Sequence, residues 1–434
     1  MNLLPRLFAY ISIFAAYILF MHTYAPMGVY WQDFHAQRIF NAVEFLKLNG
    51  YFSTYGFTIW NSCANCALNA EEWQDKMYFS VHALTLLPYI SFNHWGGRES
   101  LEFLGPLLDQ GIVLFCGILI AELFLKAIKD FATVPGYLAC WICFAFFALS
   151  PWTYKMIQAA WMEIYFLMFF LSGFLAFVKK KSTLGYVLFF LAGIAHYQWA
   201  FAVGMFYIAI ASSTYILNSD KSEDKYFPQH QYLNLPRAKV IFSLLLPVVL
   251  FLLWKMIAQQ YISGGDGSSI LYRIGISGND IHNGGLLGSL QFLAGTRINS
   301  CLGDFSAQDL SGGLLAKIAM YNCILSLASM AMISLASVAG MYLLIKSSSL
   351  GKKLIPPLAF GMLFFIAFFQ QSLSVHLMGY SFIFAAIFAS GLTYLLLAIS
   401  SRLDSPILGL VFLFPVVAGI CILMIRVSML AVYV

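Results

Sequence analysis

The feature that most constrains this fold is a series of long apolar runs with almost no charge inside them. Hydrophobic residues make up 61% of the 434 residues and charged residues 10%, whereas about 25% of a soluble domain is charged. A backbone in lipid must satisfy its own hydrogen bonds, so only helices and closed barrels cross a membrane. Barrel strands alternate apolar and polar residues, and these runs do not. The sequence therefore predicts an all-α polytopic membrane protein.

About eleven of the runs are predicted to cross the membrane, whose apolar core is about 30 Å thick. Arg6 precedes the first run and no clear small-residue cleavage site follows it, so we interpret it as a retained signal-anchor helix. Together the predicted spans form a single transmembrane domain over residues 1–434. They are Leu7–Met21, Leu104–Leu125, Val134–Ser150, Trp161–Val178, Thr183–Ala195, Ala200–Ile216, Val240–Ile257, Ile318–Ile345, Leu354–Phe369, Gly379–Ile399 and Pro406–Met424.

The distribution of Lys and Arg predicts the orientation of these spans. With the N-terminus in the cytoplasm, most Lys and Arg near span ends fall inside, including the run Lys179–Lys181. The net charge of +5 is spread thinly, without a basic stripe, so nucleic acid is not an expected partner. Most of the remaining polar residues then lie outside. They occupy a first external loop at 30–103, a Gly-rich loop at 258–317 and the short turn Pro151–Trp161.

The first external loop is predicted to contain two helices that lie in the membrane interface. The segment Phe34–Leu48 has apolar residues at helical spacing and is entered through Asp33. The apolar stretch Met77–Ile90 is too short for a comfortable span, and counting it as one would place Lys179–Lys181 outside. Asp33 is well suited to cap a helix N-terminus. A carboxylate at the water–lipid boundary could also take a proton from an acceptor hydroxyl, and the two roles are compatible.

The order of these features resembles the GT-C superfamily of integral membrane glycosyltransferases, which use lipid-phosphate-linked sugars as donors. An acidic residue, Asp33, begins the first external loop, and a span closes on the Pro-containing turn in "LSPWTYK". Glu163 opens the next span, a short span returns through "AGIAHYQWAF", and "HLMGYSF" forms a late external turn. The resemblance covers nearly the whole chain in topology and implies a GT-C-like fold with interfacial helices. It also implies sugar transfer to a glycan or lipid-linked acceptor.

The expected chemistry needs few catalytic groups. The phosphate of a polyprenyl-phosphate sugar leaves as a stable anion, so one base and phosphate-binding cations suffice. Asp33 is the candidate base, and direct displacement would invert the anomeric carbon. Glu163 could orient the acceptor or share the base role, or it could only hydrogen-bond another helix. Lys155 could pair with Glu163, contact the phosphate or simply extend to the interface.

Further residues are candidates for binding the two substrates. His196 and Gln198 interrupt an apolar stretch and could donate to the donor phosphate, or they could only anchor the helix at the interface. The late external turn offers His376 and Tyr380 where many GT-C relatives have Arg. Aromatic residues of the loops, Tyr55 and Trp95 among them, could stack on sugars. Weaker candidates for acceptor or glycan contacts are His35, Arg38, Arg273 and Arg297.

The eight cysteines and the absence of sequons bear on the compartment. Five cysteines lie in or beside spans and are expected to be packing residues, namely Cys116, Cys140, Cys143, Cys323 and Cys421. Cys63, Cys66 and Cys301 lie in external loops, where a disulfide is the leading interpretation and the pairing stays open. No N-x-S/T sequon occurs, which favours a bacterial inner membrane with the site on its periplasmic face. No cofactor is predicted, although a divalent metal is not excluded.

Two other function classes remain open at this point. A lipid or amphiphile transporter or flippase would also have about eleven helices, but its site should lie near the bilayer midplane on broken helices. A membrane O-acyltransferase could use His196 or His376 as its base. Acidic and histidine residues gathered at one external rim would favour glycosyl transfer over both.

Overall fold

The structure is a computed structural model that describes residues 3–24, 33–59, 77–78, 83–128, 136–158, 163–197, 199–201, 203–205, 208, 237–261, 293–294, 314–347, 381–403 and 406–430. The predicted span Leu354–Phe369 and most of Ala200–Ile216 and of the loop 258–317 lie outside these residues. So do Gln198, Arg273, Arg297, His376 and Tyr380, and the side chains of Asp33, His35, Lys155 and Glu163.

Apart from turns such as 50–57, the described residues form helices and one pair of two-residue strands. These strands, β1 (Thr58–Ile59) and β2 (Met77–Tyr78), pair antiparallel. A 3₁₀ helix, η2, covers Ala83–Leu86. The α-helices are α1 (Leu3–Tyr24), α2 (Asp33–Asn49), α4 (Leu87–Ala127), α5 (Gly136–Ala148), α6 (Pro151–Gln158), α7 (Glu163–Val178), α8 (Ser182–Ala195), α10 (Arg237–Tyr261), α14 (Leu314–Ser347), α16 (Ser381–Ser400) and α17 (Pro406–Leu430).

Several of these helices have the length and apolar character of membrane spans. Among the described residues, four segments meet both criteria: Leu84–Lys126, Lys239–Tyr261, Lys317–Leu344 and Ile407–Ser428. The helices α5, α7, α8 and α16 contain shorter apolar stretches. The length and the apolar character of these helices confirm the prediction of a helical membrane protein. The number of eleven spans stays a prediction.

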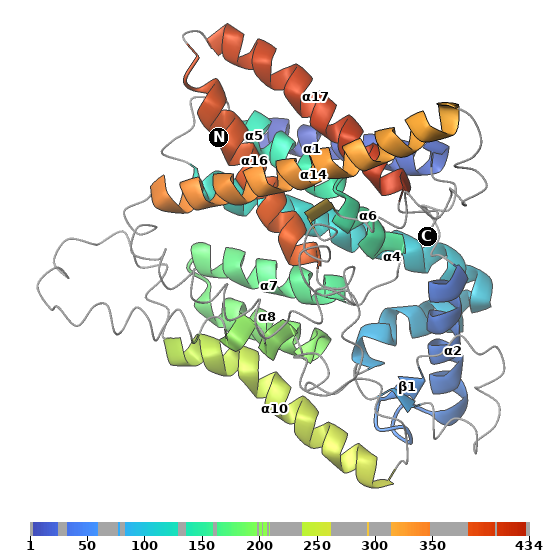
Figure 1. The fold of residues 1–434 in the computed structure, drawn as a ribbon. Helices are drawn as coiled ribbons and strands as arrows, with labels where there is room; N and C mark the ends of the chain where they lie inside the picture. The colour runs from blue at the N-terminus through green and yellow to red at the C-terminus, as the bar shows by residue number, and fades with distance from the viewer. Residues whose placement is uncertain are drawn as a thin grey trace, which may run out of the picture.

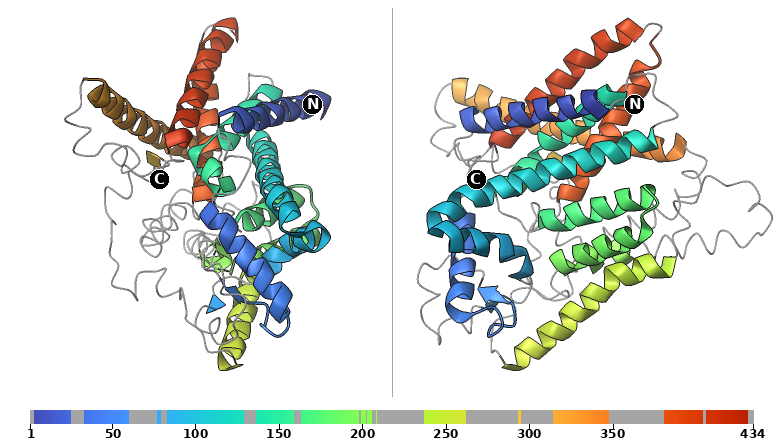
Figure 2. Two further views of the ribbon diagram at one scale, coloured as in Figure 1. Left: turned by 90° about the vertical axis from the view of Figure 1, so that its right-hand side faces the viewer. Right: turned by 180° about the vertical axis from the view of Figure 1, so that it is seen from behind.

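Most of the helices run between two sides of the molecule (Figure 1). On one side, which we call the basic side, α4 ends with Lys126 in its last turn, α7 turns into α8 through exposed Lys179–Lys181, and α14 ends with Lys346. The opposite side, which we call the α2 side, carries α2, β1 and α6. It also receives the first turn of α7 and the last turns of α8 and α10 (Figure 2).

Close packing of small residues joins α14 to α16. A Cβ atom on Gly340 would overlap the carbonyl oxygen of Gly391, and one on Gly391 would overlap the carbonyl oxygen of Ser337. The two backbones are therefore nearly in contact, as in membrane helix pairs that associate through small residues. Beside this crossing, the Trp152 ring of α6 packs against Phe384 and Phe388 of α16, with centroids 4.8 and 5.0 Å away.

A kink divides α4 into two parts. Gly96 and Gly97 have non-helical backbone angles, and Gly97 has φ of +69°, a conformation that glycine adopts without a steric penalty. We call Leu87–Trp95 the pre-kink segment. The predicted interfacial helix at Met77–Ile90 is wrong in its bounds, because 77–78 form β2 and the α-helix begins only at Leu87.

The region predicted as the turn Pro151–Trp161 contains the short helix α6. Ser150 precedes it and its hydroxyl accepts a hydrogen bond from the backbone N–H of Thr153 at 3.2 Å. Proline follows at the first helical position, where its missing N–H costs nothing. Ser150 and Pro151 thus supply both local signals for a helix start, so this prediction is corrected.

Enlarging Gly391 tests the α14–α16 contact. We expect Gly391→Ala to lower the free energy of unfolding by about 1–3 kcal/mol, since the added methyl must push two backbones apart. Gly419→Ala in α17 is the matched control, because no atom lies within 4 Å of its added Cβ. Thermal unfolding of the purified protein in detergent measures both. Equal stability of the two variants would contradict the close approach.

Candidate functional site

The helix ends that carry the predicted site residues gather on the α2 side. Asp33 is the first residue of α2, Glu163 the first of α7, and Lys155 lies in α6. His196 directly follows the last residue of α8. Figure 1 shows these ends on the same side of the bundle. Arg38 is half-buried on α2. The structure therefore gives backbone positions for Asp33, Glu163 and Lys155. For His196 it also gives the side chain.

His196 joins two helical segments. It caps the C-terminal end of α8 in an extended conformation, and its backbone N–H donates to Ala192 O. Its Nδ1 accepts a hydrogen bond from the backbone N–H of Trp199 at 3.3 Å, and its carbonyl accepts one from Ala200 N at 3.1 Å. These are the contacts of an N-cap residue. A neutral imidazole that accepts at Nδ1 carries its proton on Nε2, so the buried ring presents a donor there.

Aromatic stacking connects this helix break to α10. The Tyr197 and Phe251 rings are stacked with centroids 4.0 Å apart, and the His196 ring lies nearly parallel to Tyr197. On α10 the residues Phe251, Lys255 and Ala258 are buried, whereas Trp254, Met256 and Ile257 are exposed. Lys255 thus lies one turn beyond Phe251 on the face that packs on α8. At 8% exposure it is a buried cation.

A turn after α2 meets the end of α10 through aromatic rings. Trp254 Nε1 donates to Tyr55 O at 2.6 Å, and the Tyr55 and Tyr261 rings stack with centroids 5.7 Å apart. Tyr55 has a φ of +54°, which is uncommon for a residue with a side chain. Burial raises the pKa of Tyr51 in this turn to about 12. The residues Tyr261 and Trp254 remain 70% and 43% exposed, so they can contact a sugar or the interface.

A chain of hydrogen bonds reaches from α7 into the centre of α4. Tyr165 OH donates to Tyr89 OH at 3.1 Å, and Tyr89 OH donates to a carboxylate oxygen of Asp109. The three side chains are 7%, 1% and 0% exposed, in that order. We call these residues the tyrosine chain. Tyr165 lies two residues after Glu163, so the chain begins next to a predicted site residue.

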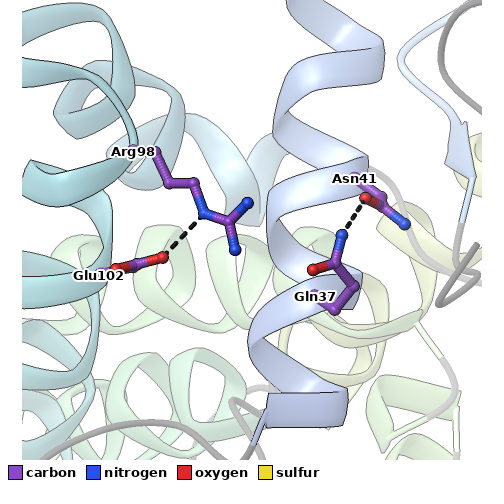
Figure 3. Close-up of polar contacts among 4 residues, drawn as sticks. All are labelled: Gln37, Asn41, Arg98 and Glu102. Carbon is purple, nitrogen blue, oxygen red and sulfur yellow. Dashed lines mark hydrogen bonds and ion pairs between the residues drawn. The ribbon is translucent and has the colours of Figure 1, made fainter. Parts of the chain in front are cut away.

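Arg98 connects the start of the α4 span to α2. Its Nε donates to Glu102 Oε1 at 2.8 Å, and its guanidinium carbon lies 4.5 Å from the centroid of the Phe40 ring. Figure 3 shows the Arg98 side chain extending from α4 toward α2, where Gln37 donates to Asn41. Of these contacts, the one between Arg98 and Phe40 joins α2, which begins at Asp33, to α4.

One cysteine differs from its expected role. Cys323, which was predicted to be a packing residue, is disulfide-bonded, so that prediction is wrong. It lies nine residues after the start of α14 at Leu314, about 14 Å along the helix. The N-terminal end of α14, which is the end nearer to Cys323, belongs to the α2 side. The other described cysteines, Cys116, Cys140, Cys143 and Cys421, are free, as expected for packing residues.

Comparison with known proteins provides no additional assignment. The chain matches no family model, no curated protein and no solved structure. Two ionisable residues were not predicted from the sequence, namely Lys255 on the α2 side and Asp109 in the centre of α4. Both interrupt apolar runs that we had assigned to spans, and ionisable residues inside spans are usually functional. That signal could have identified both. No sequence signal singles out Tyr89.

Substitution can separate the capping of the Trp199 N–H by His196 from the other contribution of its imidazole ring. His196→Asn keeps an acceptor for the Trp199 N–H and removes the imidazole, so we expect stability near that of the wild type. His196→Ala removes the cap as well, and should lower the free energy of unfolding by about 1 kcal/mol. Thermal unfolding compares the two variants. Equal destabilisation by both would show that the cap is not what the side chain contributes.

The disulfide of Cys323 can be located by peptide mapping. We expect mass spectrometry of the non-reduced protein to find Cys323 linked to Cys63, Cys66 or Cys301. Cys421, which is free and half-buried, is the control and should appear as an unlinked peptide. Recovery of Cys323 as a free thiol from freshly purified protein would contradict the assignment.

Proposed function

We propose that the protein is a GT-C-type membrane glycosyltransferase that moves a sugar from a polyprenyl-phosphate donor to a glycan or lipid-linked acceptor. The proposal includes about eleven spans and an inverting reaction with Asp33 as the general base. It places the α2 side on the extracytoplasmic face of a bacterial inner membrane, in cell-envelope glycan synthesis. The proposal requires no cofactor.

The observation that carries this proposal is the meeting of α8 and α10 on the side where α2 and α7 begin. There the rings of Tyr197 and Phe251 stack, the buried His196 directly precedes Tyr197, and the buried Lys255 lies one helical turn after Phe251. An ammonium and an imidazole N–H can both donate charge-assisted hydrogen bonds to the oxygens of a phosphate held at the end of a lipid tail. The first residues of α2 and α7 supply the two carboxylates.

The reaction then requires three steps from these residues. Lys255 and His196 bind the donor phosphate and stabilise the negative charge that develops on it as it leaves. Asp33 accepts the proton of the acceptor hydroxyl as its oxygen attacks the anomeric carbon. Attack from the side opposite the phosphate inverts that carbon. Glu163 orients the acceptor, and exposed Tyr261 and Trp254 offer stacking surfaces for further sugars.

Two observations support the proposed orientation. The exposed lysines between α7 and α8 lie on the basic side, and cytoplasmic loops carry an excess of Lys and Arg. The disulfide-bonded Cys323 belongs to the opposite side, and disulfides persist in oxidising compartments such as the periplasm. Both observations support an external position for α2.

Purified protein incubated with a panel of polyprenyl-phosphate sugars tests the proposal. We expect release of polyprenyl phosphate together with a glycosylated acceptor. Asp33→Asn should lower kcat at least about 100-fold, because the general base is lost. Near-normal turnover by Asp33→Asn would eliminate this mechanism, and no release from any donor would eliminate the function.

Lys255→Met tests the phosphate-binding role. Loss of one charged hydrogen bond should lower kcat/KM about 10- to 100-fold, and Lys255→Arg should restore most of it. Lys317→Met, which removes an exposed ammonium in the first turns of α14, is the matched control and should behave like the wild type. Equal activity of Lys255→Met and Lys317→Met would remove Lys255 from the site.

A proton-coupled transporter is a second candidate that one observation favours. Two acids of α4, Asp109 and Glu122, lie within its apolar stretch, and each accepts a hydrogen bond from a tyrosine. Intramembrane acids with such partners occur in proton relays of transporters. Vesicles containing the purified protein distinguish the candidates. Transfer of sugar without net movement of lipid-linked donor favours the enzyme, and donor movement driven by a proton gradient favours transport.

A further inference from the structure

The tyrosine chain joins three parts of the molecule that the sequence keeps apart. Tyr89 belongs to the pre-kink segment, Asp109 to the part of α4 beyond the kink, and Tyr165 to the first turn of α7. Tyr89 and Asp109 are 20 residues apart. In a straight helix that separation corresponds to about 30 Å. Their hydrogen bond therefore exists only because α4 folds back at Gly96 and Gly97.

Tyr89 is the central member of this chain. Its hydroxyl accepts from Tyr165 and donates to Asp109, while the Tyr89 and Tyr165 rings meet edge to face with centroids 6.5 Å apart. A buried hydroxyl without a partner is costly, so each of the three groups favours the arrangement that satisfies the other two. Removing the Tyr89 hydroxyl alone breaks both links.

The neighbours of the pre-kink segment connect this chain to the proposed site. The 3₁₀ helix η2, which leads directly into the pre-kink segment, contacts α8, and α4 packs on α7. The pre-kink segment is thus held close to both α7 and α8. The first turn of α7 begins with Glu163, and α8 ends at His196.

We propose that Tyr89 is a positioning residue of the site. Through Asp109 and Tyr165 it holds the pre-kink segment against α7, and so fixes the first turn of α7 relative to the end of α8. The consequence for sugar transfer rests on the proposed function, whereas the consequence for local structure does not. In this role Asp109 serves as a hydrogen-bond acceptor, and its charge is not required.

Four variants and one control test this inference. Tyr89→Phe breaks both links, and Tyr165→Phe breaks only the link to α7 and leaves Tyr89 bonded to Asp109. Asp109→Asn keeps an oxygen that can accept from Tyr89 but cannot take up a proton, whereas Asp109→Leu keeps neither property. Tyr186→Phe removes a hydroxyl from α8 that is outside the chain, and serves as the matched control.

Two measurements are made on each variant. Hydrogen exchange of residues 87–95 and 163–167 reports the position of the two segments, and initial rates of sugar transfer report KM and kcat separately. We expect Tyr89→Phe and Asp109→Leu to speed exchange at both segments about tenfold and to lower kcat/KM about tenfold, mainly through KM. Tyr165→Phe should affect 163–167 alone. Asp109→Asn and Tyr186→Phe should resemble the wild type.

Other outcomes either overturn the positioning role of Tyr89 or show that the proposed function is wrong. Unchanged exchange in Tyr89→Phe, or faster exchange with normal kcat/KM, overturns the positioning role. Equal loss in Asp109→Asn and Asp109→Leu shows that Asp109 acts through its charge or its proton, which also overturns it. If the wild-type protein transfers no sugar, the proposed function is wrong and the exchange pattern alone decides the inference.

Discussion

The structure depends on the requirement that polar groups between apolar helices find partners there. Water is absent from the bilayer core, so an unsatisfied backbone or side-chain group costs several kcal/mol. Several polar side chains that enter the bundle make specific contacts. Tyr10 of α1 donates to Glu122 of α4 at 3.1 Å, Tyr89 donates to Asp109, and Ser334 donates to Leu293 O at 2.7 Å. These contacts join segments that lie far apart in the sequence.

The same requirement explains why polar residues concentrate on the α2 side. The bundle ends there in helix termini, whose free backbone groups need caps. Ser150 supplies one cap before α6, and His196 supplies another after α8. Residues chosen to satisfy a helix end also bring donors and acceptors to the rim of the bundle. A binding site at this rim therefore needs only a few additional groups, of which Lys255 is the clearest.

Apolar runs in the sequence predicted much of the fold. The predicted ends of spans such as Thr183–Ala195 and Trp161–Val178 agree with α8 and α7 to within two residues, because lipid exposure requires unbroken apolar helices. The helix opened by Asp33 was also predicted. The folding back of α4 was not, because the Gly96–Gly97 pair alone does not tell a kink from a loop. Asp109 and Lys255 were missed because single ionisable residues barely lower the hydropathy of a long run.

The double role of His196 has a consequence for any group that binds beside it. The backbone N–H of His196 closes the end of α8 and its ring caps the start of the next segment, so one residue serves both. A bound molecule that rotates this ring would release the Trp199 amide while the backbone cap of α8 stayed in place. Occupancy at the rim would thus loosen the segment that starts after His196 and leave α8 intact, without any hinge between domains.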